Sequence, residues 1–150
     1  MNAVQFRNAT PADLSWINSQ YDEIGFRRSS LINEKLIIAL NEETPIGLGR
    51  LVGVGPNSAE LGGISVFSQF RGQGVAREIV NHLLEWRDTY DKLYCLPFEN
   101  LKKFYMSFSF SEANPLDAEL PYEIKEKLKW CNTGDRYPDA TILLTMSIIV

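Results

Sequence analysis

The spacing of hydrophobic residues predicts a chain in which strands come first and then alternate with helices. Runs that alternate apolar and polar residues are typical of strands, whereas apolar residues three or four positions apart indicate a helix. By this criterion strands are predicted at residues 4–7, 34–40, 45–52, 59–66, 93–96 and 140–149. Helices are predicted to start at residues 10–13 and to cover residues 73–86, 101–108 and 121–131, with a loop or short helix at residues 22–33.

This order of elements predicts the α+β fold class. Consecutive strands followed by strands that alternate with helices favour a mixed, mostly antiparallel sheet of about six to seven strands flanked by helices. A chain of 150 residues is too short for two comfortable hydrophobic cores. We therefore expect a single domain over residues 1–150.

Composition and charge exclude several classes of protein. The chain is 45% hydrophobic and 23% charged, as globular proteins are. Its 15 basic and 19 acidic side chains give a net charge of −4 and neither half is basic, which argues against a nucleic-acid partner. Two cysteines and one histidine are too few for a usual zinc site, so we expect no metal.

The sequence also predicts a compartment. The start of the chain has no basic stretch followed by an apolar run, so no signal peptide is visible. No apolar run reaches the roughly 20 residues that cross a bilayer. We expect a cytoplasmic protein with free thiols at Cys95 and Cys131 and no membrane partner, and leave open whether it forms a homodimer.

The segment Arg71-Gly72-Gln73-Gly74-Val75-Ala76 carries the clearest chemical signal. A glycine-containing turn that opens a helix directs several unpaired backbone N–H groups at one point, where the helix dipole adds positive charge. Such a turn binds an anion such as a phosphate, and Arg71 can add a charged donor. A dinucleotide fingerprint is excluded because residue 77 is Arg, and a Walker loop because Gly-Lys-Ser/Thr is absent. The simpler alternative is that the glycines only turn a strand into a helix.

These residues resemble a known family. The segment 71–76 is similar to the Arg/Gln-x-x-Gly-x-Gly/Ala signature of the GNAT superfamily, the acyl-coenzyme A N-acyltransferases. The preceding segment 60–66 looks like that family's central strand, and residues 103–110 resemble its Phe/Leu-Tyr-x-x-x-Gly-Phe segment. The resemblance covers nearly the whole chain in element order. It implies a sheet whose fourth and fifth strands splay apart, with a bulge that Gly62-Gly63 would tolerate.

The resemblance implies that acetyl-coenzyme A (acetyl-CoA) is the acyl donor. Backbone N–H groups of residues 71–76 would hold the pyrophosphate, and the pantetheine arm would run along residues 64–66. The implied cofactor-binding residues are Ile64, Ser65, Val66, Arg71, Gly72, Gln73, Gly74, Val75, Ala76, Asn100 and Phe104.

The resemblance also implies two catalytic residues. Tyr105 would protonate the leaving thiolate, and a main-chain N–H near Val66 would stabilise the oxyanion. Glu60 is the candidate general base, which would take a proton from the acceptor ammonium through water. The alternatives are that Tyr105 only packs in the core and that Glu60 only ends a strand.

Three features depart from the family's pattern. Ser109 stands where the family has a glycine, Asn100 lies closer to Tyr105 than expected, and residues 121–131 add a helix that many members lack. The alternation of Lys125, Lys127 and Lys129 with glutamates predicts an exposed face for that helix.

The acceptor site is expected between the first helices and the sheet. Its candidate residues are Tyr21, Asp22, Phe26 and Arg28. Because both signs of charge are present there, amino acids, amines and peptide termini all stay open.

Two classes of function remain at this stage. The first is an N-acetyltransferase that moves acetyl from acetyl-CoA to a primary amine of a small molecule, such as an amino acid or a polyamine, by direct attack in a ternary complex. The alternatives are a non-catalytic CoA-binding or regulatory module on the same fold and a protein or peptide N-acetyltransferase.

Overall fold

The computed structural model describes residues 3–148, so Met1, Asn2, Ile149 and Val150 lie outside the described residues. The chain forms two compact units: one comprises residues up to Val52 together with Gly63–Trp86, and the other Gly53–Gly62 together with the residues from Arg87 on. Hydrogen-bonded strands follow one another in the order β1-β2-β3-β4-β5-β7-β6. Within residues 3–148, no helix is long and apolar enough to cross a membrane.

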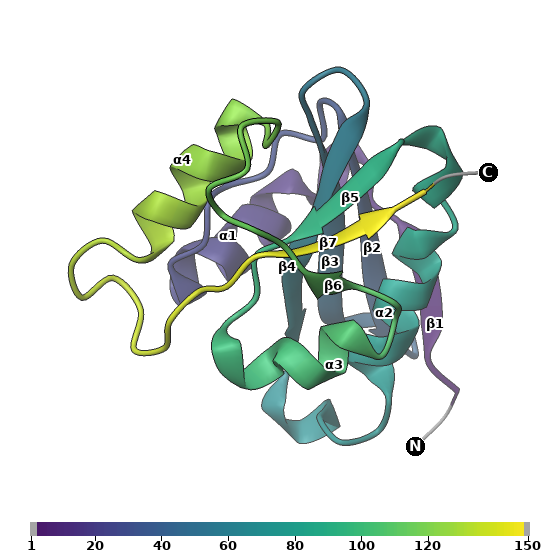
Figure 1. The fold of residues 1–150 in the computed structure, drawn as a ribbon. Helices are drawn as coiled ribbons and strands as arrows, with labels where there is room; N and C mark the ends of the chain where they lie inside the picture. The colour runs from purple at the N-terminus through teal and green to yellow at the C-terminus, as the bar shows by residue number, and fades with distance from the viewer. Residues whose placement is uncertain (1–2, 149–150) are drawn as a thin grey trace. The chain divides into compact units, whose positions relative to one another are not determined.

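The observed elements follow the predicted order (Figure 1). The strands are β1 Gln5–Asn8, β2 Glu34–Asn41, β3 Thr44–Val54, β4 Ser58–Val66, β5 Lys92–Cys95, β6 Ser111–Glu112 and β7 Leu144–Ser147. The helices are α1 Leu14–Ile24, α2 Val75–Leu84, α3 Lys102–Met106 and α4 Tyr122–Cys131. The pairs β1–β2, β2–β3, β5–β7 and β6–β7 are antiparallel, and β4–β5 is parallel. The α+β class and the mostly antiparallel sheet are therefore confirmed.

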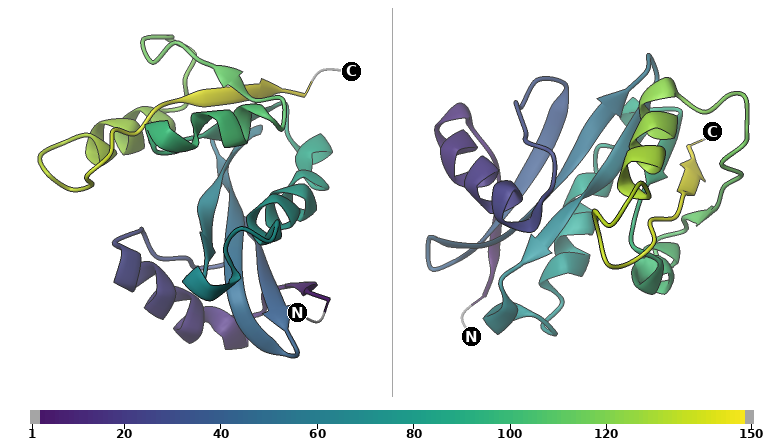
Figure 2. Two further views of the ribbon diagram at one scale, coloured as in Figure 1. Left: turned by 90° about the horizontal axis from the view of Figure 1, so that it is seen from below. Right: turned by 90° about the vertical axis from the view of Figure 1, so that its left-hand side faces the viewer.

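In the first unit, α1 and α2 cover opposite faces of the β2–β3 pair (Figure 2). Alternate residues of a strand point to opposite faces. On one face, Ile17 and Tyr21 of α1 pack in a buried cluster with Leu36, Ile38, Leu40 and Leu48. On the other, Ile79 of α2 lies directly over Gly47 and Gly49, where a methyl group would meet its side chain. The two glycines let α2 approach the sheet closely.

The loop between α1 and β2 is not a helix. Gly25 ends α1 at φ 73°, and Leu31 and Asn33 adopt φ 65° and 57°, which no α-helix accommodates. Polar bonds hold this loop: the Asn18 side chain bonds both the N–H and the C=O of Ser29, at 2.7 and 2.9 Å. Of the two alternatives that the sequence left open for residues 22–33, the structure has the loop from Gly25 on, whereas residues 22–24 are the last turn of α1.

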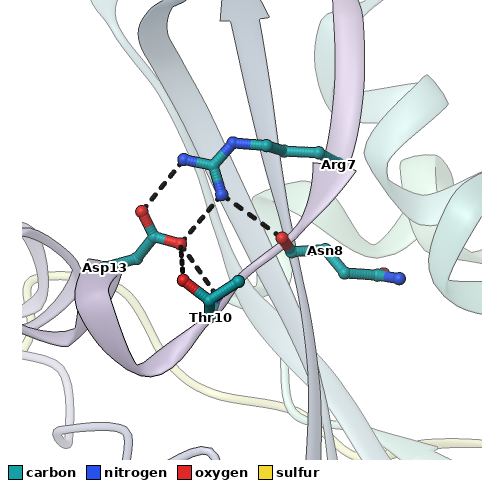
Figure 3. A network of polar contacts seen from close by, with 4 residues as sticks. All are labelled: Arg7, Asn8, Thr10 and Asp13. Atoms are coloured by element: carbon teal, nitrogen blue, oxygen red, sulfur yellow. Dashed lines mark hydrogen bonds and ion pairs between the residues drawn. The ribbon is translucent and has the colours of Figure 1, made fainter.

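The start of α1 is stabilised by a carboxylate (Figure 3). Asp13 accepts two hydrogen bonds from Arg7, at 2.8 and 2.9 Å, and one from the Thr10 N–H at 2.8 Å. The Arg7 guanidinium is the main reason that the pKa of Asp13 falls from 3.8 to about 2. The predicted helix start at residues 10–13 corresponds to a short 3₁₀ turn, Pro11–Asp13, that leads into α1.

In the second unit, α4 packs on one face of β5. Tyr94 of β5 forms a buried cluster with Leu120, Ile124 and Leu143, and Leu128 packs against it. β5 pairs with β7 from Lys92–Ser147 to Cys95–Leu144, and the short β6, which the hydrophobic pattern did not reveal, pairs with the other edge of β7. The last strand is shorter than the predicted 140–149, of which Ile149 lies outside the described residues.

The turn after α3 keeps the backbone of the family's pattern despite the missing glycine. Ser109 has φ 78°, in the left-handed region that glycine favours, and its N–H bonds to the carbonyl of Met106 at 3.0 Å. The departure at Ser109 therefore changes the side chain and not the turn.

Replacing Asp13 by Asn is expected to lower the free energy of unfolding by about 1 kcal/mol near pH 7, because an ion pair at the protein surface contributes modestly. The folded pKa of about 2 lies below the ordinary 3.8, so this stabilisation is present above pH 3.8 and is lost as the pH falls through 2. Urea denaturation from about pH 7 to about pH 3 should show the difference narrowing. Asp22→Asn, at a fully exposed ion pair, is the control with a smaller loss; a pH-independent loss at Asp13 would contradict the assignment.

Ser109→Gly is expected to stabilise the protein by about 0.5 kcal/mol. A left-handed L-residue costs about 1–2 kcal/mol, and this relief exceeds the roughly 0.5–1 kcal/mol of extra backbone entropy that glycine loses on folding. Ser107→Gly is the matched control, because Ser107 has φ −65° and should lose stability on the same change. Thermal denaturation distinguishes the two, and a loss at both positions would show that the φ of Ser109 is not strained.

Candidate functional site

The turn that leads into α2 has the backbone of an anion site. Gly72 and Gly74 adopt φ 77° and 81°, and Gly74 is the N-cap of α2. No side-chain hydrogen bond caps this helix, and the Glu78 N–H donates to the Gly74 carbonyl at 3.1 Å. The N–H groups that precede Glu78 in a helix have no carbonyl one turn back. They can therefore bind an anion.

The surface of this turn is open. A Cβ atom built on Gly72 or Gly74 would meet nothing within 4 Å. The glycines are thus required by the positive φ and not by crowding, and a ligand can reach the main chain. Arg71 anchors the turn to the end of β4, because its Nε donates to the Val66 carbonyl at 2.9 Å. The sequence prediction placed the anion site at these residues, and their backbone conformation fits it.

β4 carries a kink at Gly63. This residue has φ 61°, and the Tyr21 hydroxyl donates to its carbonyl at 2.9 Å. The Arg50 guanidinium stacks over the Tyr21 ring at 4.1 Å. A methyl group on Gly63 would lie 2.6 Å from the Tyr21 hydroxyl and 3.0 Å from Arg50 Nε. Only glycine fits both the φ and the space at this position.

Parallel pairing between β4 and β5 stops just before the kink. The register runs from Ser58–Lys92 to Leu61–Cys95, although β4 itself continues to Val66. Ile64 and Ser65, in the continuation, are only partly buried. Pairing that covers only the first part of β4 agrees with the splayed central strands that the family resemblance implied.

Tyr105 lies in the second unit with a free donor. The residue is buried on α3, and its ring packs edge-on against Phe104 at 5.0 Å. Burial, and next the nearby Cys95, raise the pKa of Tyr105 well above its ordinary value, so the hydroxyl is protonated at neutral pH. No other residue in the described range accepts a hydrogen bond from it. Asn100 is exposed on the 3₁₀ turn Glu99–Leu101 that precedes α3.

Glu60 is buried on β4 and paired with a lysine. Its Oε2 lies 2.7 Å from the Nζ of Lys127, and the two side chains are 9% and 22% exposed. The expectation that Lys127 belongs to an exposed face of α4 was therefore wrong, whereas Lys125 and Lys129 are exposed. Charge alternation along the helix could not reveal a buried carboxylate 67 residues away.

Cys95 links the two catalytic candidates electrostatically. Burial, and next the Glu60 carboxylate, raise the pKa of the Cys95 thiol, while Lys127 lowers it. Glu60 pairs in register with Tyr94, on the face that α4 covers, whereas Cys95 points to the other face. Glu60 thus lies on β4 close to the last β4–β5 pair, and Tyr105 is near enough to Cys95 for that thiol to raise its pKa.

The acceptor candidates lie in the first unit and are already engaged with one another. Tyr21 is 0% exposed, and burial raises its pKa. Asp22 and Arg28 form a two-point ion pair, at 2.6 and 3.0 Å, on the surface. Phe26 is half-buried, with its ring 6.3 Å from that of Tyr21. Their role in binding an acceptor stays a prediction.

Arg50 is a buried cation that the sequence pattern did not single out. This residue is buried on β3, and it donates to the Ser29 hydroxyl at 2.6 Å and to the Arg27 carbonyl at 2.8 Å. The available signal was a charged residue inside an otherwise apolar strand, because buried cations require partners.

The described residues offer no metal site, but they do form a pocket. Among residues 3–148 no group of three or more His, Cys, Asp or Glu side chains could hold a metal ion. Cys95 and Cys131 are both buried. The second unit also has a surface pocket of about 430 Å³ between α3, β6 and α4, which Lys102, Glu112 and Thr141 help to line.

Comparisons with known proteins agree with this geometry. Residues 5–110 match the Acetyltransferase (GNAT) family. N-acetylglutamate synthase from Neisseria gonorrhoeae, complexed with coenzyme A and N-acetyl-glutamate, superposes with a TM-score of 0.74 at 16% identity over 100% of this chain. The chain spans only 36% of the length of that synthase.

Two further solved structures are similar over nearly their full length. Rv2747 from Mycobacterium tuberculosis, in complex with CoA and NLQ, has a TM-score of 0.73 at 19% identity and covers 97% of this chain and 99% of its own. A GNAT family acetyltransferase from Elizabethkingia anophelis with acetyl-CoA bound has a TM-score of 0.63 at 17% identity, over 99% and 100%. No curated protein matches significantly in sequence.

At these identities the solved structures establish the fold alone, whereas the family match covers more than half of the residues. The chain belongs to the acetyltransferase (GNAT) family of acetyl-CoA-dependent acyltransferases.

Proposed function

We propose that the protein transfers acetyl from acetyl-CoA to a primary amine of a small molecule, by direct attack in a ternary complex. The observation that carries the proposal is the uncapped N-terminus of α2 behind Gly72 and Gly74, both at positive φ. A diphosphate fits this turn because backbone N–H groups and the helix dipole stabilise negative charge there.

The remaining cofactor contacts follow from the strand that precedes the turn. The pantetheine arm hydrogen-bonds the main chain of Ile64, Ser65 and Val66, beyond the last β4–β5 pair. Phe104 and Asn100, at the start of the α3 region, contact the same arm. A main-chain N–H near Val66 stabilises the oxyanion as the thioester is attacked.

Two carriers of protons complete the reaction. Glu60 accepts a proton from the acceptor ammonium, directly or through water, and the free amine attacks the thioester carbonyl. Tyr105 donates a proton to the departing thiolate and is reprotonated by the second proton that the nitrogen loses as the amide forms. The burial that raises the pKa of Tyr105 also raises that of a thiol beside it, so the two groups stay matched.

A covalent acyl-enzyme is disfavoured. Cys95 is completely buried, and burial raises its pKa well above the ordinary value, so the thiol stays protonated and unreactive. Direct attack needs no enzyme nucleophile.

The acceptor class is narrowed by the charges near α1. Asp22 and Arg28 offer an anion and a cation close together, which suits a molecule with both an ammonium and a carboxylate. The solved synthase from Neisseria gonorrhoeae, which holds N-acetyl-glutamate, supports an amino acid as acceptor. The low number of cysteines, two in 150 residues, supports a cytoplasmic location.

Arg71→Glu is expected to abolish the thermal stabilisation that coenzyme A gives to the wild-type protein. The substitution removes the bond to the Val66 carbonyl and places a negative charge beside the diphosphate. Thermal denaturation with and without coenzyme A measures the effect. Lys129→Glu makes the same change of charge at an exposed position of α4 and should leave the stabilisation intact. Unchanged binding of coenzyme A by Arg71→Glu would mean that the turn does not hold the cofactor.

Tyr105→Phe is expected to lower turnover about 100-fold while leaving the stabilisation by coenzyme A unchanged, because general acid catalysis contributes on the order of 10²–10⁴. Release of free thiol from acetyl-CoA over a panel of amino acids, polyamines and aminoglycosides measures turnover. Tyr94→Phe, at another buried tyrosine of the same unit, is the control with full turnover. Binding without thiol release for any amine or peptide would favour the non-catalytic module, and release with peptides alone would favour a peptide acetyltransferase.

A further inference from the structure

The Nζ of Lys127 lies where an acceptor nitrogen has to lie. A group that gives its proton to a general base must approach it to hydrogen-bond distance, roughly 2.6–3.2 Å. Under the proposed function Glu60 is that base, and the Lys127 Nζ is 2.7 Å from its Oε2. The nitrogen is a primary amine, which is the proposed acceptor chemistry.

The position of Lys127 on α4 separates it from its neighbours. α4 packs against the second unit through Ile124 and Leu128, and Lys127 lies at the edge of this buried face. Lys125 and Lys129, each two residues away, are rotated by about 200° around the helix and are exposed. Of the three, only Lys127 is directed at the sheet.

The surroundings of Lys127 include the rest of the proposed chemistry. The charges of Glu60 and Lys127 both act on the thiol of Cys95, and Cys95 in turn acts on Tyr105. The candidate base lies next to the last β4–β5 pair with the lysine in contact with it, and the candidate acid belongs to the same unit of the structure.

We infer that Lys127 is itself an acetyl acceptor, so that the protein acetylates its own α4 when no other amine is bound. This inference rests on the proposed function. Glu60 takes one proton from the Lys127 ammonium, and the resulting amine attacks the carbonyl carbon of acetyl-CoA. The C–N bond forms, the C–S bond breaks, and the coenzyme A thiolate receives a proton from Tyr105. The nitrogen loses its second proton as the amide forms, and this proton restores the Tyr105 hydroxyl, while the proton on Glu60 passes to solvent. The products are N-acetyl-lysine and coenzyme A.

The modification changes the charge balance of the site. Acetylation turns the Lys127 ammonium into a neutral amide and so removes the cation that occupies the Glu60 carboxylate. A buried carboxylate without a partner is unfavourable, so it would attract another cation. The ammonium of a small-molecule acceptor supplies that cation.

The test is acetylation of the purified full chain by acetyl-CoA alone, followed over time by peptide mass mapping. Lys125 and Lys129 are internal controls, because their exposed amines report the uncatalysed reaction with acetyl-CoA in the same sample. We expect Lys127 to be acetylated at least about tenfold faster than either, corresponding to about 1.4 kcal/mol in barrier.

Three variants distinguish enzymatic transfer from local reactivity. Glu60→Gln and Tyr105→Phe should slow acetylation of Lys127 to the rate of Lys125 and Lys129 without changing those two rates. Lys127→Arg keeps a cation beside Glu60 but has no acetylatable amine, so acetylation at position 127 should disappear while stabilisation by coenzyme A is retained. This variant remains informative if Glu60→Gln fails to fold.

The outcomes separate the inference from the proposed function. Acetylation of Lys127 at the rate of Lys125 and Lys129, in a protein that releases thiol with an external amine, would overturn the inference alone. Absence of both coenzyme A binding and thiol release would overturn the proposed function and the inference with it. Fast acetylation of Lys127 that is unaffected by Glu60→Gln and Tyr105→Phe would overturn the inference, because the reaction would then not use the proposed catalytic residues.

Discussion

The bond from the Tyr21 hydroxyl to the carbonyl of Gly63 joins α1 to the point where β4 changes direction. Tyr21 is wholly buried, and the Arg50 guanidinium covers its ring. A side chain at Gly63 would occupy the volume of the tyrosine hydroxyl, and φ 61° is unfavourable for an L-residue. The kink is therefore enforced from both sides: by the backbone conformation and by the atoms packed against it.

The two halves of β4, before and after this kink, have different neighbours. Before it, residues 58–61 stay in the ladder with β5, which holds Glu60 in a buried position beside Tyr94. After the kink, the strand continues to Val66, whose carbonyl accepts a hydrogen bond from Arg71 Nε. The chain then enters the turn at the start of α2. The same strand thus carries the candidate base in one unit and leads into the candidate anion site in the other.

Much of this could be predicted from the sequence where the determinants are local. Glycine at positions 72 and 74, next to an amphipathic helix, suffices to predict the turn because positive φ and helix periodicity are properties of neighbouring residues. Arg50 and Lys127 could not be assigned, since their partners are distant in the chain and charge alone favours the surface. The two-residue strand β6 is too short to show the alternation of apolar and polar residues by which strands are predicted. At Ser109 the family's glycine was missing, but the backbone kept the left-handed turn at some cost.

The pairing of Glu60 with Lys127 gives α4 a role besides covering the sheet: it neutralises a buried carboxylate. A carboxylate buried on a central strand requires a cation or several donors, because desolvation of an unpaired charge is costly. In this chain the required cation comes from α4, and the rest of that helix is anchored by Ile124 in the core and by the bond from the Gly55 N–H to Glu123, at 2.8 Å. α4 is thus bound to the sheet at both its apolar face and its charged edge. α4 thus supplies the partner of the candidate base, so that the state of this buried carboxylate depends on the helix as well as on the strand that carries it.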